Sequence, residues 1–231
     1  MKVSKNLTSI IMPFYNEENF LEKSALNLVK ENFNKEIILV NDGSNDRSLE
    51  IATELEKIHK EIKLIDNKEN MGKGYAVKLG LGQVSGNIVG IFDADLEYST
   101  QDLKNLINLL VKDNFDFVCG SRFIGTRERK NIYFRTFMAN KFLSFLFSVI
   151  NRNKITDIAT CLKVFKKDLL KDINLEKNDF SIEIELIAKA LSKTTNYKEL
   201  PISYNGRSYS DGKKIKLIDG FRYIAAIFKY K

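Results

Sequence analysis

The stretch Phe92-Asp93-Ala94-Asp95-Leu96-Glu97 follows the apolar run of residues 87–91 and carries two carboxylates one residue apart, where a β-strand is expected to end. Two such side chains reach the same loop, and their oxygens suit a hard divalent cation, Mg²⁺ or Mn²⁺, that carries a diphosphate. An isolated Asp-x-Asp is also common in turns and helix caps. The loops that follow the other strands have to decide between these two interpretations.

The first half of the chain alternates β-type apolar runs with segments of helical periodicity, which is typical of a parallel sheet with crossover helices. We therefore expect an α/β fold with a mostly parallel central sheet flanked by helices, and ligands at the carboxyl ends of its strands. Strands are expected at residues 7–12, 36–41, 62–66, 88–93 and 115–119, and helices at residues 19–32, 44–59, 73–84 and 100–113.

Composition favours a folded, water-soluble protein, because 44% of the 231 residues are hydrophobic and 29% are charged. The sequence shows no linker or repeat, so we expect one domain over residues 1–231. The only histidine, His59, lies in a charged segment, and Cys119 and Cys161 lack metal-ligand spacing, which argues against a zinc site or a histidine-based triad. No signal peptide is recognisable, so a cytoplasmic location is expected.

The net charge of +7 is unevenly distributed along the chain. Residues 122–171 carry 12 basic and 3 acidic side chains, and residues 207–231 carry 7 and 2. Such a distribution predicts that part of the surface contacts an anion, whether phosphate, acidic lipid or nucleic acid.

Polar loops follow the first three expected strands. Asp42 stands where the second strand ends and can accept hydrogen bonds from a nucleobase, while Tyr15 offers an aromatic face after the first. The loop Asn70-Met71-Gly72-Lys73-Gly74 opens a helix, where glycines let the backbone approach a ligand and Lys73 can neutralise phosphate. Turn chemistry explains each loop taken alone, but the ordered series favours a nucleotide site.

Seven stretches of the chain, four at these loops and three beyond them, resemble the inverting glycosyltransferases of family 2 with the GT-A fold, and especially their dolichol-phosphate mannose synthase and polyprenyl-phosphate glycosyltransferase branch. The matching stretches cover almost the whole chain in order. They are residues 11–18, 40–46, 70–74, 93–98, 120–123, 157–165 and 204–215. Two departures are Asn41, where an aspartate is commoner, and Glu97, where some members carry glutamine, so the resemblance does not decide between Mg²⁺ and Mn²⁺.

The resemblance implies a nucleotide-sugar-binding half, residues 1–121, and an acceptor-binding half, residues 122–231. Arg207 and Lys213 would close over the donor diphosphate, with Asp95, Arg122 and Arg207 as the residues most directly involved in catalysis. The donor would be linked to UDP or GDP. The implied donor-binding residues are Pro13, Tyr15, Glu17, Asp42, Lys73, Asp93, Arg207 and Lys213, and the implied metal ligands are Asp93, Asp95 and Glu97.

Arg122 and Arg135 match the arginines with which related synthases grip the phosphate of a polyprenyl acceptor, a task that suits the bidentate guanidinium. Arg127 and Arg129 lie between them and fit either the same role or a solvated basic surface. The Phe-rich segment 134–150 is too short in its apolar part to cross a bilayer. It fits an amphipathic helix at the cytoplasmic face of a membrane or, equally, a core-packing helix.

The expected reaction is a single displacement that moves a hexosyl group from a nucleotide sugar to dolichyl or undecaprenyl phosphate with inversion. A phosphate acceptor is already anionic and needs no general base, whereas a saccharide hydroxyl does. In that alternative, a family 2 enzyme of surface-polysaccharide synthesis, the candidate bases are Glu183, Glu185 and Asp157. A non-catalytic binder of anionic lipid or nucleic acid would not need the Asp-x-Asp and the ordered loops, so we expect no nucleic-acid partner.

Overall fold

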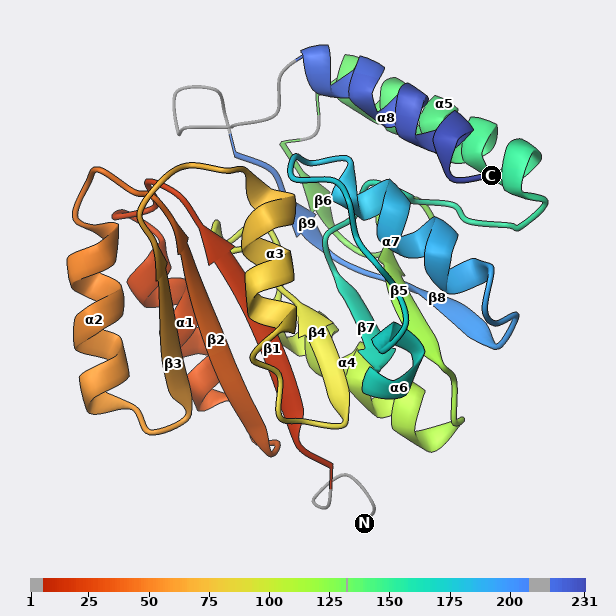
Figure 1. The fold of residues 1–231 in the computed structure, drawn as a ribbon. Helices are drawn as coiled ribbons and strands as arrows, with labels where there is room; N and C mark the ends of the chain where they lie inside the picture. Colours follow the sequence, from red (N-terminus) through yellow and green to blue (C-terminus); the bar gives the residue numbers. More distant parts are fainter. Residues whose placement is uncertain (1–5, 132, 208–216) are drawn as a thin grey trace.

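The computed structural model describes residues 6–131, 133–207 and 217–231 (Figure 1). Its first half alternates strands and helices. In order these are β1 (Thr8–Phe14), α1 (Leu21–Lys30), β2 (Lys35–Asp42), α2 (Ser48–Ile58), β3 (Ile62–Asn67), α3 (Lys73–Leu81), β4 (Ile88–Ile91), α4 (Thr100–Lys112) and β5 (Phe117–Ser121). The second half contains β6 (Arg129–Lys130), α5 (Phe134–Asn151), β7 (Lys163–Lys166), α6 (Lys167–Leu170), α7 (Ile182–Leu191), β8 (Tyr197–Pro201), β9 (Tyr204–Asn205) and α8 (Leu217–Lys229).

Seven of the described strands form one sheet in the order β3-β2-β1-β4-β7-β5-β8. Neighbouring strands are parallel except at β7, which is antiparallel to both β4 and β5. The strand order reverses direction at β1, which pairs with β2 on one side and with β4 on the other. Parallel strands that diverge in this way leave a crevice at their carboxyl ends.

Helices cover both faces of the sheet, as Figure 1 shows. On one face Ile10 and Met12 of β1 share a core with α1, α2 and α4. On the other, Ile11 packs with Ala76 of α3. Burial on both faces explains why the parallel strands are nearly continuous apolar runs rather than alternating ones.

The predicted α/β fold is confirmed, and all five predicted strands and four predicted helices are present, with ends displaced by a few residues. Helix α4 illustrates why the prediction succeeds. Ser99 caps its N-terminus by accepting a hydrogen bond from Gln101 N at 3.2 Å, and its buried residues Leu103, Leu106, Ile107 and Leu110 follow the helical period.

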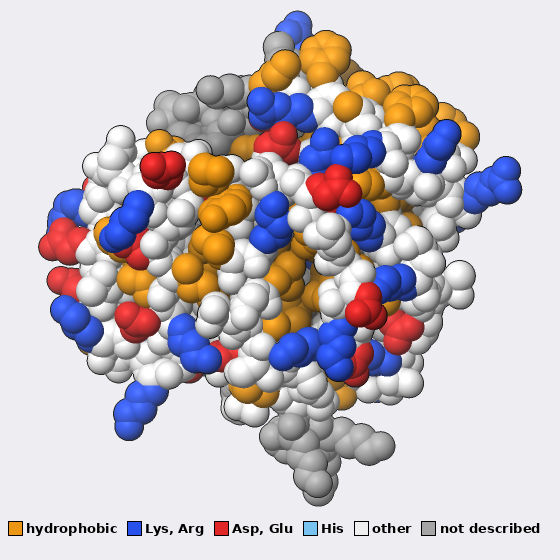
Figure 2. Space-filling view, in the orientation of Figure 1, with side chains coloured by type: hydrophobic (Ala, Val, Ile, Leu, Met, Phe, Trp, Pro, Cys, Tyr) orange, Lys and Arg blue, Asp and Glu red, His pale blue; other side chains and the backbone are white. Residues whose placement is uncertain are grey.

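Helices α5 and α8 lie side by side above the sheet (Figure 1), and both contribute to a core that includes Phe147 and Ile227. Their outer sides are apolar and exposed. Eight hydrophobic side chains there are 49–74% exposed: Phe134, Met138, Phe142, Phe145 and Val149 on α5, and Ile218, Phe221 and Phe228 on α8. Figure 2 shows hydrophobic side chains gathered over this part of the surface, which we call the α5–α8 apolar face. Within the described ranges, no helix is both long and apolar enough to span a bilayer.

At the opposite end of the sheet, the buried carboxylate of Glu36 joins three segments. It accepts hydrogen bonds from Ser9 Oγ at 2.5 Å and Ser85 N at 2.7 Å, and it pairs with Lys63 Nζ at 2.6 Å. Burial alone would raise the pKa of Glu36, but the Lys63 ammonium and the hydrogen bonds outweigh it and lower that pKa to about 2.

Replacing Glu36 by Gln should therefore destabilise the protein by about 1–3 kcal/mol at pH 7, because several donors lose a charged acceptor. The folded pKa lies below the unfolded one, so the stabilisation is complete above the unfolded pKa, about 4.3, and is lost as the pH falls toward 2. Urea unfolding of both proteins between pH 7 and pH 3 measures the difference, which should shrink on acidification. The exposed Glu54→Gln on α2 is the control and should change stability by less than about 0.5 kcal/mol; a pH-independent difference would contradict the assignment.

Candidate active site

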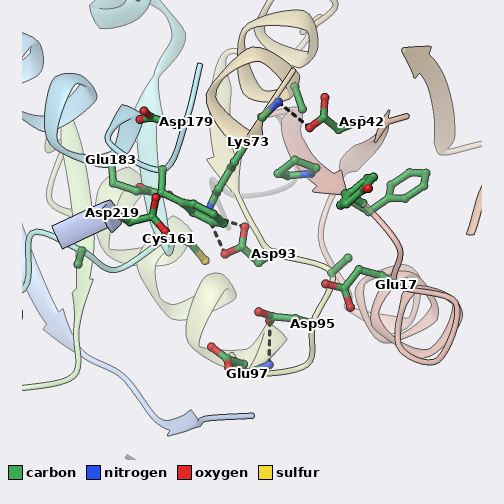
Figure 3. A pocket seen from close by; sticks show the side chains of 18 of the residues that line it. Glu17, Asp42, Lys73, Asp93, Asp95, Glu97, Cys161, Asp179, Glu183 and Asp219 are labelled. Carbon is green, nitrogen blue, oxygen red and sulfur yellow. Dashed lines mark hydrogen bonds and ion pairs between the residues drawn. The ribbon is translucent and has the colours of Figure 1, made fainter. Parts of the chain in front are cut away.

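A pocket of about 680 Å³ opens at the carboxyl ends of β1, β2, β4 and β5 and extends toward α7 and α8. Its described lining contains eight carboxylates but only four basic side chains. The carboxylates are Glu17, Asp42, Asp93, Asp95, Glu97, Asp179, Glu183 and Asp219, and the basic residues are Lys73, Arg122, Arg207 and Arg222. Figure 3 places Asp42 and Glu17 on one side of the pocket and Asp179, Glu183 and Asp219 on the other, with Asp93 between them.

The loop after β4 turns sharply at Leu96, whose φ of 60° lies in the left-handed region that a leucine rarely adopts. This turn lets Glu97 N donate to Asp95 Oδ1 at 3.0 Å. The Glu97 side chain points instead to the segment from β9 onward, accepting from the Tyr204 hydroxyl at 2.7 Å and from Arg207 N at 2.8 Å.

The three carboxylates expected to share a cation do not form a common ligand set. Asp93 pairs with Lys73 Nζ at 2.8 Å, and both oxygens of Glu97 accept hydrogen bonds from the β9 segment. Across the described ranges, three or more Asp, Glu, His or Cys side chains are nowhere gathered as a metal cage. The role of Glu97 as a metal ligand stays a prediction, and in this structure its carboxylate anchors the segment from β9 onward.

Asp93 and Asp95 nevertheless fit a divalent cation. Burial raises the pKa of Asp95 to about 8, and the charges of Glu97 and Asp93 add to the shift while Arg207, 3.4 Å away, opposes it. A carboxylate that is this costly to ionise indicates too little positive charge nearby. A hard cation would supply that charge through oxygen ligands of the preferred kind.

Arg207 belongs to the second half of the chain, and its side chain contacts residues of the first half. Its guanidinium makes a bidentate pair with Glu17, at 2.7 and 3.1 Å, and stacks over the ring of Phe20. The structure therefore brings Arg207, Glu17 and Asp95 together, as the sequence predicted for a donor-phosphate site. Lys213 lies outside the described residues.

Lys73 lies in a buried chain of alternating charges. Its ammonium group contacts Asp93 and Glu183, each at 2.8 Å, and Glu183 also pairs with the fully buried Lys163. Burial alone would raise the pKa of Glu183, but Lys163 and Lys73 outweigh it and lower that pKa. Lys73 lines the pocket as predicted, although its charge is shared with two carboxylates.

Backbone donors occupy the carboxylate of Asp42, which accepts from Met71 N at 2.9 Å and Gly72 N at 2.8 Å. Pro13 and Tyr15 line the same end of the pocket. The residue before Asp42 explains one departure from the family pattern, because Asn41 donates to Asp66 Oδ1 at 2.8 Å and accepts from Ser44 N. An aspartate at that position would face the carboxylate of Asp66.

The glycines of residues 70–74 allow another segment of the chain to pack closely against this loop. A Cβ on Gly72 would lie 2.5 Å from Asn178 O, and one on Gly74 would lie 2.5 Å from Lys177 O. Gly72 also has a φ of 98°, which favours glycine. Gly72 and Gly74 are needed for the close approach of the segment before α7, and Gly72 also lines the pocket.

Arg122 lines the pocket, where it stacks on Tyr204 and is held by Asp157. Arg122 Nε and Nη2 donate to the two oxygens of Asp157 at 2.7 and 2.8 Å, and the backbone N donates at 3.0 Å. Arg135, in the first turn of α5, and the neighbouring Arg127 and Arg129 are exposed and do not line this pocket.

The sequence did not indicate one wall of the pocket. Its residues come from the start of α7 and from α8: Asp179, Phe180, Asp219, Arg222 and Tyr223. The matching family stretches end before α8, and no strand-end motif marks these residues. The amphipathic pattern of residues 217–229 is the signal from which at least the helix could have been found.

An open α/β sheet with an acidic Asp-x-Asp pocket at its strand ends defines a class of nucleotide-binding enzyme. The family model for glycosyl transferase family 2 matches residues 9–173. The chain therefore belongs to glycosyltransferase family 2 and is a glycosyltransferase.

Curated relatives agree with this assignment. A UDP-N-acetylglucosamine–dolichyl-phosphate N-acetylglucosaminyltransferase of Methanococcus voltae is 27% identical, over 95% of this chain and 94% of its own. A dolichyl-phosphate β-glucosyltransferase of Trichomonas vaginalis is 30% identical, over 90% and 68%. A dolichol-phosphate mannosyltransferase of Pyrococcus furiosus is 29% identical, over 96% and 62%. These names confirm the predicted resemblance to the polyprenyl-phosphate branch.

Among solved structures, glucosyl-3-phosphoglycerate synthase of Mycobacterium tuberculosis, in complex with Mn²⁺, UDP and glucosyl-3-phosphoglycerate, has a TM-score of 0.76 to this chain. The match covers 97% of this chain and 80% of that one at 15% identity. At that identity the likeness confirms the GT-A fold.

Replacing Asp95 by Asn should stabilise the protein when no divalent cation is present. The folded pKa lies far above the unfolded one, so ionising Asp95 destabilises the fold increasingly as the pH rises from about 4 to about 8. Melting at pH 8 in EDTA should show a gain of at least about 1 kcal/mol, roughly 2–4 °C, which fades toward pH 4.

Adding Mn²⁺ should raise the melting temperature of the wild type and have much less effect on Asp95→Asn. The exposed Asp172→Asn serves as the control and should behave like the wild type in both conditions. Equal Mn²⁺ stabilisation of the two proteins would show that Asp95 is not a ligand.

Proposed function

We propose that this glycosyltransferase moves a hexosyl group from a nucleotide sugar to a polyprenyl phosphate, with inversion and with the help of Mg²⁺ or Mn²⁺. The observation that carries this proposal is that the three candidate general bases named from the sequence, Asp157, Glu183 and Glu185, are already committed to basic or backbone partners. A phosphate acceptor needs no base. The relatives described above are named as transferases that use dolichyl phosphate, and these names support the same acceptor class.

The three carboxylates that could have served a hydroxyl acceptor have other partners. Asp157 is fully engaged with Arg122, and Glu183 lies between Lys73 and Lys163 with a lowered pKa. Glu185 accepts from Glu176 N and Lys177 N, both at 2.8 Å, and does not line the pocket. A carboxylate held as an anion by two ammonium groups is a weak proton acceptor, which disfavours the polysaccharide alternative.

For the donor, we propose that Pro13, Tyr15 and Asp42 hold the nucleoside, with the diphosphate near Asp93 and Asp95. A cation bound there offsets negative charge on the departing nucleoside diphosphate. Lys73 and Arg207 can turn from their carboxylate partners toward the phosphates, and Lys213 is proposed to follow Arg207. Donor binding is then not confined to residues 1–121, because Arg207 supplies part of it.

For the acceptor, we propose that the phosphate contacts Arg122. Two of its three hydrogen bonds to Asp157 come from the side chain, through Nε and Nη2. Because a guanidinium carries five N–H donors, this pairing leaves donors that a phosphate can use. Asp157 fixes the orientation of the guanidinium, and Arg122, although buried, lines the pocket. Arg135 is exposed and does not line this pocket, and we propose that it contacts anionic headgroups beside α5.

The α5–α8 apolar face is proposed to lie on the membrane that holds the acceptor. Its exposed side chains on α5 recur at intervals of three and four residues, which places Phe134, Met138, Phe142 and Phe145 on one side of the helix. Arg135 and Lys141 are exposed beside them. This combination is typical of helices that lie in a membrane interface, and the cytoplasmic face is the proposed side.

The direct test is a donor and acceptor screen read by mass spectrometry. The protein is incubated with UDP-glucose, UDP-N-acetylglucosamine or GDP-mannose, with undecaprenyl or dolichyl phosphate, and with Mn²⁺, Mg²⁺ or EDTA. A glycosylated lipid phosphate that forms with one donor, requires the cation and has the inverted anomer by NMR is the expected result. Transfer only to a saccharide hydroxyl would select the alternative.

Arg122→Lys keeps the charge beside Asp157 but removes the planar fork that faces the acceptor. We expect kcat/KM for polyprenyl phosphate to fall by about 10- to 100-fold, with unchanged affinity for the nucleotide sugar. The exposed Arg47→Lys is the control and should keep both values. Loss of donor affinity in Arg122→Lys would instead place Arg122 in the donor site.

Replacing Phe145 by Ser should weaken binding to vesicles of phosphatidylcholine and phosphatidylglycerol by about ten-fold, because one large side chain no longer enters the interface. Activity on a short-chain, water-soluble prenyl phosphate should not change. Ile58→Ser, at an apolar residue of similar exposure on α2, is the matched control in co-sedimentation. Equal binding of the two variants would exclude this face from membrane contact.

A further inference from the structure

The pocket has a distinct end between α7 and α8 that neither the nucleotide loops nor Arg122 accounts for. Asp179 and Phe180 precede α7, while Asp219, Arg222 and Tyr223 belong to the first turns of α8, and all five line the pocket. In Figure 3, Asp179 and Asp219 lie across the pocket from Asp42 and Glu17, beyond Asp93. A molecule that reaches from Asp42 past Asp93 arrives at this end.

The charges at this end are unsuited to an anion. Arg222 lies between two carboxylates, with Nη1 3.2 Å from Asp219 Oδ1 and Nε 3.6 Å from Asp179 Oδ2. The two acids outnumber the one guanidinium, so a phosphate here would meet a net negative charge. Arg122, in contrast, is balanced by the single carboxylate of Asp157.

The same groups suit a neutral polyhydroxylated ring. Carboxylate oxygens accept hydrogen bonds from hydroxyl groups, and a guanidinium donates to them in a fixed geometry. Phe180 and Tyr223 add aromatic surface to the same wall. Asp219 and Tyr223 are each only 5% exposed, so hydrogen bonds made there are shielded from water.

We infer that Asp179, Asp219 and Arg222 form the subsite for the hexosyl group of the donor and determine which sugar is accepted. This inference rests on the proposed function and extends it from the diphosphate to the sugar. With the nucleoside at Asp42 and the diphosphate near Asp93, the hexosyl group lies at the α7–α8 end. Its hydroxyl groups there exchange hydrogen bonds with Arg222 and its two carboxylate partners.

The test compares free nucleotide with nucleotide sugar, because only the latter reaches this end. Calorimetric titrations with Mn²⁺ measure the Kd of UDP and GDP and of UDP-glucose, UDP-N-acetylglucosamine and GDP-mannose. The variants are Arg222→Gln and Asp219→Asn, with Lys229→Gln on the same helix but outside the pocket as the matched control. Melting temperatures establish that each variant is folded.

Arg222→Gln and Asp219→Asn should bind the free nucleoside diphosphate within about two-fold of the wild type and should bind the preferred nucleotide sugar about ten-fold or more weakly. The wild-type preference between donor sugars should narrow by a similar factor. Lys229→Gln should change neither quantity. Because Arg222 is half exposed, its substitution is expected to leave the fold intact, and Asp219→Asn tests the subsite independently.

Three results would overturn the inference while leaving the proposed function in place. The affinities for free nucleotide and for nucleotide sugar could both be unchanged in the two variants. Both affinities could instead fall by the same factor. Finally, only the KM for polyprenyl phosphate could rise. The third result would assign this end to the acceptor. A wild-type protein that binds none of the nucleotide sugars would instead refute the proposed function itself.

Discussion

The structure depends on how the protein balances the carboxylates that its strand ends bring into one pocket. Asp42 ends β2, and Asp93 and Asp95 follow β4; these two parallel strands flank β1, so the topology alone places the three side chains at one edge of the sheet. Basic residues from distant segments then approach them. Lys73 of α3 pairs with Asp93 and with Glu183 of α7, and Arg207, which follows β9, pairs with Glu17, so ion pairs join the two halves of the fold.

This balance is incomplete, and the remaining negative charge makes the pocket suitable for its ligand. Ionising Asp95, whose pKa is raised to about 8, would add a negative charge that the protein does not fully compensate. A diphosphate could not enter such a site alone, because two anions would face each other. A bound cation would offset the negative charge of the carboxylates and that of the diphosphate. This is the physical reason for an Asp-x-Asp at the end of a buried strand. The strained turn at Leu96 belongs to the same loop and directs the neighbouring Glu97 away from that site.

The first half of the fold and the nucleotide end of the site could be predicted from the sequence because they obey local rules. Strands buried on both faces are apolar runs, α4 has a serine cap and a regular stripe, and polar loops mark the strand ends. The second half does not follow such rules. Residues 182–186 of α7 alternate apolar and acidic side chains as an edge strand would, yet they are helical, and Glu183 is buried against Lys73 and Lys163, which lie far from it in the chain. Strand β7 has only four residues and includes the buried Lys163. Burying its charge in the sheet is tolerated because Lys163 pairs with Glu183.

The same dependence on distant partners explains why the roles of single residues were less predictable than their positions. Gly72 lines the pocket but also makes room for Asn178, and Glu97, which is predicted to bind a cation, also anchors the segment that carries Arg207. Helix α8 extends this logic. One side of it contributes Asp219, Arg222 and Tyr223 to the pocket, while Phe221 on the other side is exposed with the apolar residues of α5. The same helix therefore forms part of the pocket wall and part of the α5–α8 apolar face. A lipid-linked acceptor and a soluble donor would then meet at a site whose wall is shared by both surfaces.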